Sequence, residues 1–142
     1  MNWYTVAVVM HVVVAVLGVG QVGALAVVAS HARRSGTTLP QAARWITPLL
    51  RYARFSLAIV LATGIWIDVA AAGVYHHAWW VRLSAILVVV TFLFHRRATT
   101  AIASGVRGDG DAAAAFWRVE RAAWAMCGAV ALITLLMEAK PF

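Results

Sequence analysis

The stretch TVAVVMHVVVAVLGVGQVGALAVVAS, residues 5–30, contains no aspartate, glutamate, lysine or arginine. A helix needs about 20 consecutive apolar residues to cross the hydrocarbon core of a bilayer, and this run exceeds that length. It also lacks the alternation of apolar and polar residues that marks a half-buried strand. The run is too long for a removable signal peptide, and it has neither a basic segment before it nor a cleavage site. We therefore predict a transmembrane helix over about residues 4–29.

The same stretch contains GVGQVG, residues 18–23, which matches the glycine pattern of dinucleotide-binding loops. Such a loop follows a strand, and an acidic residue about 20 positions later binds the ribose. Neither feature is present, because the first acidic residue of the chain is Asp68. Helical spacing instead places Gly18 two turns from His11 on one face. We therefore interpret the glycines as a helix-packing surface.

Three more apolar runs follow, at about residues 49–74, 79–103 and 116–138, and each is long enough to cross a bilayer as a helix. The chain of 142 residues is 63% hydrophobic and only 12% charged, with a mean hydropathy of +0.84. That composition excludes an ordinary water-soluble domain. The predicted fold is all-α, with a single integral membrane domain formed by a four-helix bundle.

The distribution of charge predicts the orientation of this bundle. The formal net charge is +7, and most of the arginines lie in or beside the connections between runs one and two and between runs three and four. Short loops rich in arginine stay on the cytoplasmic side. We therefore expect both termini outside and a multi-pass protein of the bacterial inner (cytoplasmic) membrane, surrounded by lipids. The same arginines explain the high pI, so no nucleic acid partner is expected.

Local signals predict the ends of the helices and the membrane interfaces. Ser35, Gly36 and Pro40 form a turn-rich connection, so the second helix is expected to start near Pro48, a residue tolerated in a first turn. Asp111 is the expected N-cap of the fourth helix. Aromatic residues mark the interfaces. They are Trp3, Tyr4, Tyr75, Trp79 and Trp80 on the outer side and Trp45 and Trp117 on the inner side.

Ionisable residues inside a membrane are functional candidates, because they are costly to place there. Counting about 1.5 Å of rise per residue from the outer aromatic residues, His11 lies roughly 10 Å deep and Asp68 roughly 13 Å deep. Arg82 either reaches the same level or extends back to the interface. A second, inner level contains Gln21, Arg54, His95 and Glu120.

Residues three or four positions apart share a helix face, and each run has one face with polar or small residues that we expect to line the bundle interior. On the second helix this face comprises Arg54, Leu57, Leu61, Gly64 and Asp68. On the third it comprises Val81, Ser84, Val88, Thr91 and His95. On the fourth it comprises Glu120, Trp124, Cys127, Ala131 and Thr134.

The neutral imidazole of His11 is a suitable axial ligand for a haem iron, and Asp68 would orient its second ring nitrogen. Gly18, on the same face, would leave room for the flat macrocycle. Arg82, or Arg54 on the inner side, would pair with a haem propionate, because a guanidinium suits a carboxylate. Alternatively, a His11–Asp68 hydrogen bond only fixes the register of two helices.

The other histidines are less suitable ligands for the same iron. His95 lies about 24 Å from the outer aromatic residues by the same count, too deep to share an iron with His11. We expect it to be a titratable group near the inner interface, close to Glu120. His76 or His77 would supply a second axial ligand only if the turn that carries them folds inward, and otherwise the iron is five-coordinate or has a ligand that the sequence does not indicate.

Several motifs together suggest a family. An early histidine in the first helix precedes two glycines (His11, Gly18, Gly20), and the second helix carries Thr63-Gly64. The third helix begins Trp79-Trp80-Val81-Arg82-Leu83 and contains the late His95, and the chain ends Lys140-Pro141-Phe142. In these features, spread over most of its length, the chain resembles the small bacterial membrane proteins that include the HemJ-type protoporphyrinogen oxidases and the CopD-like four-helix proteins.

The resemblance implies an all-helical membrane bundle, a b-type haem ligated by His11 and, in the HemJ branch, oxidation of protoporphyrinogen. That branch has a lysine where this chain has Arg82, and a tryptophan after the first histidine where this chain has Gly18. Arginine keeps its charge permanently, so Arg82 is a poor proton carrier.

We therefore expect a haem b-binding, cytochrome b-like membrane protein that transfers electrons, either protoporphyrinogen oxidase-like or quinone-linked, with its catalytic status open. A homodimer or a larger membrane complex is compatible with this function. One alternative is a small dimeric proton-coupled transporter or exporter in which His11 and Asp68 relay protons. Another is a structural subunit of a larger complex. A copper permease is disfavoured, because Met10, Met126 and Met137 are scattered along the chain.

Overall fold

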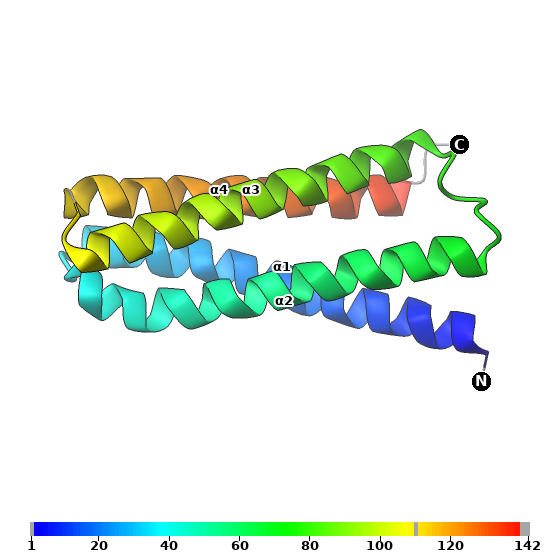
Figure 1. The fold of residues 1–142 in the computed structure, drawn as a ribbon, viewed down its shortest axis with the longest axis horizontal. Coiled ribbons are helices and arrows are strands. Elements are labelled where there is room, and N and C mark those ends of the chain that lie inside the picture. Colours follow the sequence, from blue (N-terminus) through cyan, green and yellow to red (C-terminus); the bar gives the residue numbers. More distant parts are fainter. Residues whose placement is uncertain (1, 110, 140–142) are drawn as a thin grey trace.

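The structure, a computed structural model, describes residues 2–109 and 111–139. Within these residues there is no strand, and the helices are α1 (Trp3–Arg34), α2 (Leu39–Ala70), α3 (Trp79–Arg107) and α4 (Ala112–Ala139) (Figure 1). Each helix is long and apolar enough to span a membrane. The predicted all-α four-helix bundle is thus confirmed. The ending Lys140-Pro141-Phe142, part of the family resemblance, lies outside the described residues.

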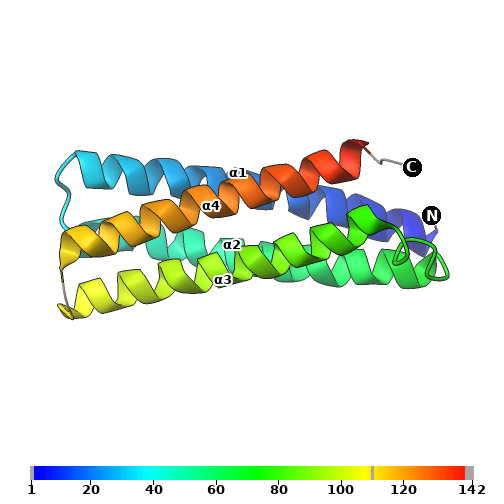
Figure 2. The same cartoon turned by 90° about the horizontal axis from the view of Figure 1, so that it is seen from above.

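The four helices run alternately up and down around a ring, because each packs against the next along the chain and α4 packs against α1 (Figures 1 and 2). The α1–α2 and α3–α4 connections lie at one end, which carries Arg34 and Arg107 and is called here the arginine end. The α2–α3 connection lies at the opposite end with the start of α1 and the end of α4. This aromatic end carries Trp3, Tyr75 and Trp79.

The second helix begins earlier than predicted, at Leu39 rather than near Pro48, and it ends at Ala70 rather than at residue 74. The N-cap residue Thr38 donates its backbone N–H to Gln41 Oε1 at 3.4 Å. Pro40 lies in the first turn, where its missing N–H has no intrahelical partner to lose. The proline in the first turn of α2 is therefore Pro40. Pro48, which was expected there, lies inside the helix.

The connection between α3 and α4 is also shorter than predicted, because α3 continues to Arg107. The fourth helix begins at Ala112, directly after the predicted N-cap Asp111. Gly108 follows α3 with a φ of 80°, a left-handed conformation that glycine adopts without strain. The predicted capping role of Asp111 is confirmed, since its Oδ1 accepts a hydrogen bond from the Ala113 N–H at 2.9 Å.

Most buried side chains lie in the half of the bundle next to the arginine end. On α1 they run from Val22 to Ala32, and among the described residues closer to the aromatic end only Ala7 is buried on this helix. On α2 they end at Leu57. Many are alanines without exposed surface, which allows close approach of helix backbones. They include Ala26, Ala29, Ala42, Ala53, Ala98 and Ala123.

Most of the predicted inward face is confirmed on α3, and only part of it is confirmed on α2 and α4, where Leu57 and Glu120 are buried. Ser84, Val88, Thr91 and His95 are all buried on α3. On α2, Arg54 and Leu61 are exposed, and on α4 Trp124, Ala131 and Thr134 are exposed. Besides Leu57 and Glu120, the buried faces carry Ile46, Leu50 and Ala53 on α2 and Val119, Ala123, Met126 and Ala129 on α4. Small and apolar residues therefore fill most of the interior of these two helices, and polar residues marked the interior better on α3.

Gly105 shows how closely α3 approaches its neighbours at the arginine end. A Cβ at this position would overlap the Leu39 side chain and lie 3.0 Å from the Ala115 Cβ. We expect Gly105→Val to lower the free energy of unfolding by about 1–3 kcal/mol, because the added atoms push α3 away from α2 and α4. Thermal unfolding in detergent measures the loss. Gly128→Val is the matched control, since nothing lies within 4 Å of a Cβ there; equal melting temperatures for the two variants would contradict this prediction.

Candidate functional site

His11 lies against α2 in the half of the bundle near the aromatic end. Its Nδ1 is 2.8 Å from Thr63 Oγ1. The single hydroxyl proton of Thr63 is directed to the backbone, with the Ile59 carbonyl oxygen 2.8 Å away. The Thr63 oxygen therefore accepts a hydrogen bond from the Nδ1–H of His11, and in the neutral imidazole this leaves the lone pair on Nε2.

Two glycines bring α1 and α2 together around this histidine. A Cβ on Gly64 would lie 3.4 Å from His11 Cε1, so the ring rests directly against the α2 backbone. A Cβ on Gly18 would lie 3.2 Å from the Ser56 Cβ. The predicted packing role of Gly18 is thus confirmed. The space next to Gly18 is occupied by Ser56, so this glycine does not leave the predicted room for a macrocycle.

The predicted contact between Asp68 and His11 is not observed. Asp68 instead binds the connection between α2 and α3. Its Oδ1 accepts hydrogen bonds from the backbone N–H groups of Tyr75 and His76, each at 3.0 Å. Its Oδ2 is 3.6 Å from His76 Nδ1. The physical reason is local, because the connection folds back over the last turn of α2 and its free N–H groups need an acceptor. The expected orienting role of Asp68 therefore belongs to Thr63.

Arg82 belongs to the same end as Asp68. Its Nε donates a hydrogen bond to the His76 carbonyl oxygen at 3.0 Å, and the side chain is exposed. The side chain of Arg82 therefore contacts the α2–α3 connection at the aromatic end. The rings of His76 and His77 lie 3.9 Å apart in this connection.

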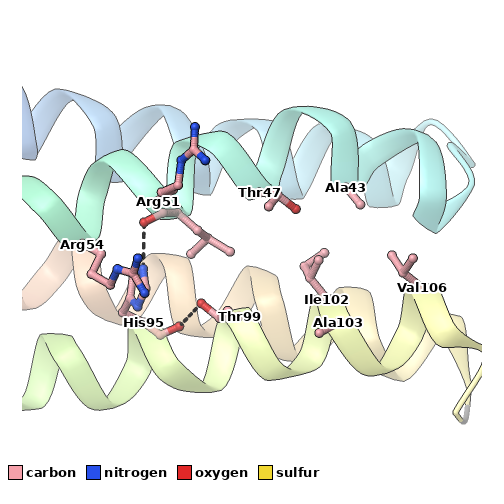
Figure 3. Close-up of a pocket in the computed structure, with 10 residues that line it drawn as sticks. Ala43, Thr47, Arg51, Arg54, His95, Thr99, Ile102, Ala103 and Val106 are labelled. Carbon is pink, nitrogen blue, oxygen red and sulfur yellow. Dashed lines mark hydrogen bonds between the residues drawn. The ribbon is translucent and has the colours of Figure 1, made fainter.

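Arg54 and His95 both line a groove between α2 and α3 (Figure 3). The groove consists of two cavities of about 370 Å³ each, and Arg54, His95 and Thr99 line both. His95 is only 6% exposed and its Nε2 donates to the Leu50 carbonyl oxygen at 2.8 Å. His95 therefore contacts the α2 backbone, whereas the partners of Glu120 are Ser30 and Arg33.

Glu120 is the only buried carboxylate among the described residues. It is 7% exposed, accepts a hydrogen bond from Ser30 Oγ at 2.8 Å and forms an ion pair with Arg33. The indole N–H of Trp124 donates to Ser30 Oγ at 3.1 Å. This network joins α1 to α4. Sequence reasoning placed Glu120 at an inner polar level but missed Ser30 and Arg33, which precede the first connection.

The predicted site residues therefore occupy separate places along the bundle. Among residues 2–109 and 111–139, no group of three or more histidine, cysteine, aspartate or glutamate side chains forms a site for a bare metal ion. No family model, curated protein or solved structure matches this chain. The function proposed below is therefore inferred from the geometry of the residues of this chain.

Proposed function

We propose that this chain is a haem b-binding electron-transfer protein of the HemJ and CopD-like type, with His11 as axial ligand of the iron. The supporting observation is the hydrogen bond from His11 Nδ1 to Thr63 Oγ1, 2.8 Å long. Histidines that bind metals almost always donate their other ring N–H to a fixed acceptor, which sets the tautomer and orients the ring. His11 is prepared in this way, with Nε2 left to bind iron.

The proposal places the bundle in the bacterial inner membrane, with the arginine end in the cytoplasm and both termini outside. Large apolar side chains are exposed on all four helices, as contact with lipid requires. Examples are Leu17, Ile65, Ile86 and Leu135. On this placement His11 lies about 12 Å along α1 from Trp3, well within the hydrocarbon layer.

The surroundings of His11 are compatible with a bound macrocycle. The half of the bundle that contains it has few buried side chains, and the Ser84 hydroxyl, buried on α3, has no hydrogen-bond partner among the described residues. Thr63 orients the imidazole and Gly64 leaves room for it against α2. Arg82, at the aromatic end, is the arginine that we assign to a propionate. When bound, haem b supplies one-electron redox chemistry.

His95 is not a second ligand on this proposal, because its Nε2 is already bonded to the Leu50 carbonyl oxygen. A quinone or a porphyrin is the proposed redox partner, since both partition into the membrane beside such a site. Transport coupled to a His11–Asp68 proton relay is less well supported, because Asp68 binds the α2–α3 connection instead.

Titration of hemin into the purified protein in detergent tests the proposal. The wild type should develop a Soret band that saturates at one hemin per chain. Thr63→Val removes the acceptor for His11 Nδ1–H, and we expect it to weaken hemin binding by about 10–100-fold, the usual effect of losing such a partner. Thr63→Ser keeps the hydroxyl and should bind hemin within a few-fold of the wild type. A wild type that stays colourless with excess hemin would refute haem binding and favour the transport or structural alternatives.

A further inference from the structure

The groove between α2 and α3 points to a second ligand. We propose that it binds an anionic phospholipid of the cytoplasmic leaflet, with the phosphate between Arg54 and Arg96 and an acyl chain along Val89 and Leu93. This inference rests on the membrane placement proposed above, and it is independent of haem binding.

The groove runs along the helices in both directions from Arg54 and Thr99. Toward the arginine end it is lined by Thr47, Ile102 and Val106 among others, and Figure 3 shows these side chains along the space between the two helices. Toward the aromatic end it is lined by Val89, Phe92, Leu93 and Arg96. A ligand that fills both cavities is therefore elongated, with its charged part in the middle of the groove.

The guanidinium groups at the groove have no carboxylate partner among the described residues. The chain has five acidic residues, and each is engaged or placed elsewhere. Glu120 pairs with Arg33, Asp109 with Arg107 and Asp68 with the α2–α3 connection. Asp111 caps α4. Glu138 lies in the last turn of α4, at the opposite end of the bundle. The charges of Arg54 and Arg96 therefore favour an external anion.

The depth of these arginines matches the lipid phosphates. Arg96 follows Trp79 by 17 positions on α3, which corresponds to about 26 Å along the helix. Arg54 precedes Ala70 by 16 positions on α2, or about 24 Å. The hydrocarbon core of a bilayer is about 30 Å thick. With the aromatic end at the outer surface, both guanidinium groups lie near the inner boundary, where basic pockets between helices bind lipid headgroups.

The apolar extension distinguishes a lipid from a soluble anion. Val89 is 58% exposed and Leu93 is 56% exposed, and both lie on the membrane side of Arg96. An inorganic phosphate would leave this part of the groove uncovered. A phospholipid covers it with an acyl chain while its phosphate accepts hydrogen bonds from the arginines, whose guanidinium geometry suits phosphate oxygens.

Native mass spectrometry of the detergent-purified chain tests this proposal. Phosphatidylglycerol should remain bound in preference to phosphatidylcholine with the same acyl chains. The double variant Arg54→Gln/Arg96→Gln should weaken retention of phosphatidylglycerol by about 25-fold, from the attraction expected of two basic groups. The matched control Arg118→Gln/Arg121→Gln removes the same charge from exposed positions on α4 and should retain the lipid as the wild type does.

A second variant tests the position of the lipid if the arginine double variant does not fold. Thr99→Trp introduces a bulky side chain into the shared part of the groove and leaves every arginine in place; it should exclude the lipid. Retention of phosphatidylglycerol by this variant, or equal loss in the Arg118→Gln/Arg121→Gln control, would overturn the proposal. Displacement of the lipid by inorganic phosphate at equal concentration would also overturn it, because the ligand would then be the soluble ion.

Discussion

A His11→Ala protein should lose the Soret band that the wild type develops with hemin. The reason is that alanine has no nitrogen to bind iron, and two of the other histidines have partners elsewhere. His95 donates to the Leu50 carbonyl oxygen, and His76 lies beside Asp68. Absorption spectra of the oxidised and dithionite-reduced protein measure the loss. We expect the band intensity at one hemin per chain to fall to the level of free hemin in the same detergent.

The matched control for this experiment is His31→Ala. His31 lies on the same helix, is exposed and has no assigned role, so its replacement should leave the spectrum unchanged. Added imidazole should restore the band to His11→Ala, because it can replace the missing ring at the iron. Rescue of this kind separates loss of a ligand from loss of the fold. A band that survives in His11→Ala and disappears in His76→Ala would move the ligand to the α2–α3 connection and contradict our assignment.

Glu120→Ala should cause the largest loss of stability among the substitutions considered. Glu120 accepts hydrogen bonds from Ser30 and Arg33 inside the bundle, and its removal leaves both donors without this acceptor. Breaking a buried ion pair from one side costs about 3–5 kcal/mol. Arg33 is partly exposed, with 32% of its side-chain surface accessible, so we expect the lower end of this range. Thermal or denaturant unfolding in detergent measures the change.

Two further variants identify the interaction responsible. Glu138→Ala removes an exposed carboxylate from the same helix and should change stability by less than about 0.5 kcal/mol. The double variant Arg33→Gln/Glu120→Ala should lose less stability than the sum of the losses in the two single variants, because the second substitution no longer breaks an ion pair. Strict additivity would show that Arg33 and Glu120 do not stabilise one another.

The sequence predicted where some residues of the candidate site lie along the helices. It did not predict their partners on other helices, for one physical reason. Depth along a helix follows from residue counting, so His11, Asp68 and Arg82 were assigned to the half near the aromatic end. The partner of each depends on how helices rotate about their axes and on the path of the connections. Thr63, which binds His11, was noticed as part of Thr63-Gly64 but was not connected with His11, because nothing in the sequence pairs two positions on different helices.

The amino-acid sequence by itself determined that this chain forms four long apolar helices. In a lipid environment the backbone polar groups of each segment must form hydrogen bonds within that segment. Hydropathy and length are therefore enough to predict a helix for a stretch such as residues 5–30. The tertiary structure decided which faces meet. Arg54 faces a groove and Leu61 is exposed, while Ala53 and Leu57 are buried. Contact between lipid and an apolar face is about as favourable as contact between two such faces, so close packing and hydrogen bonds select the interior.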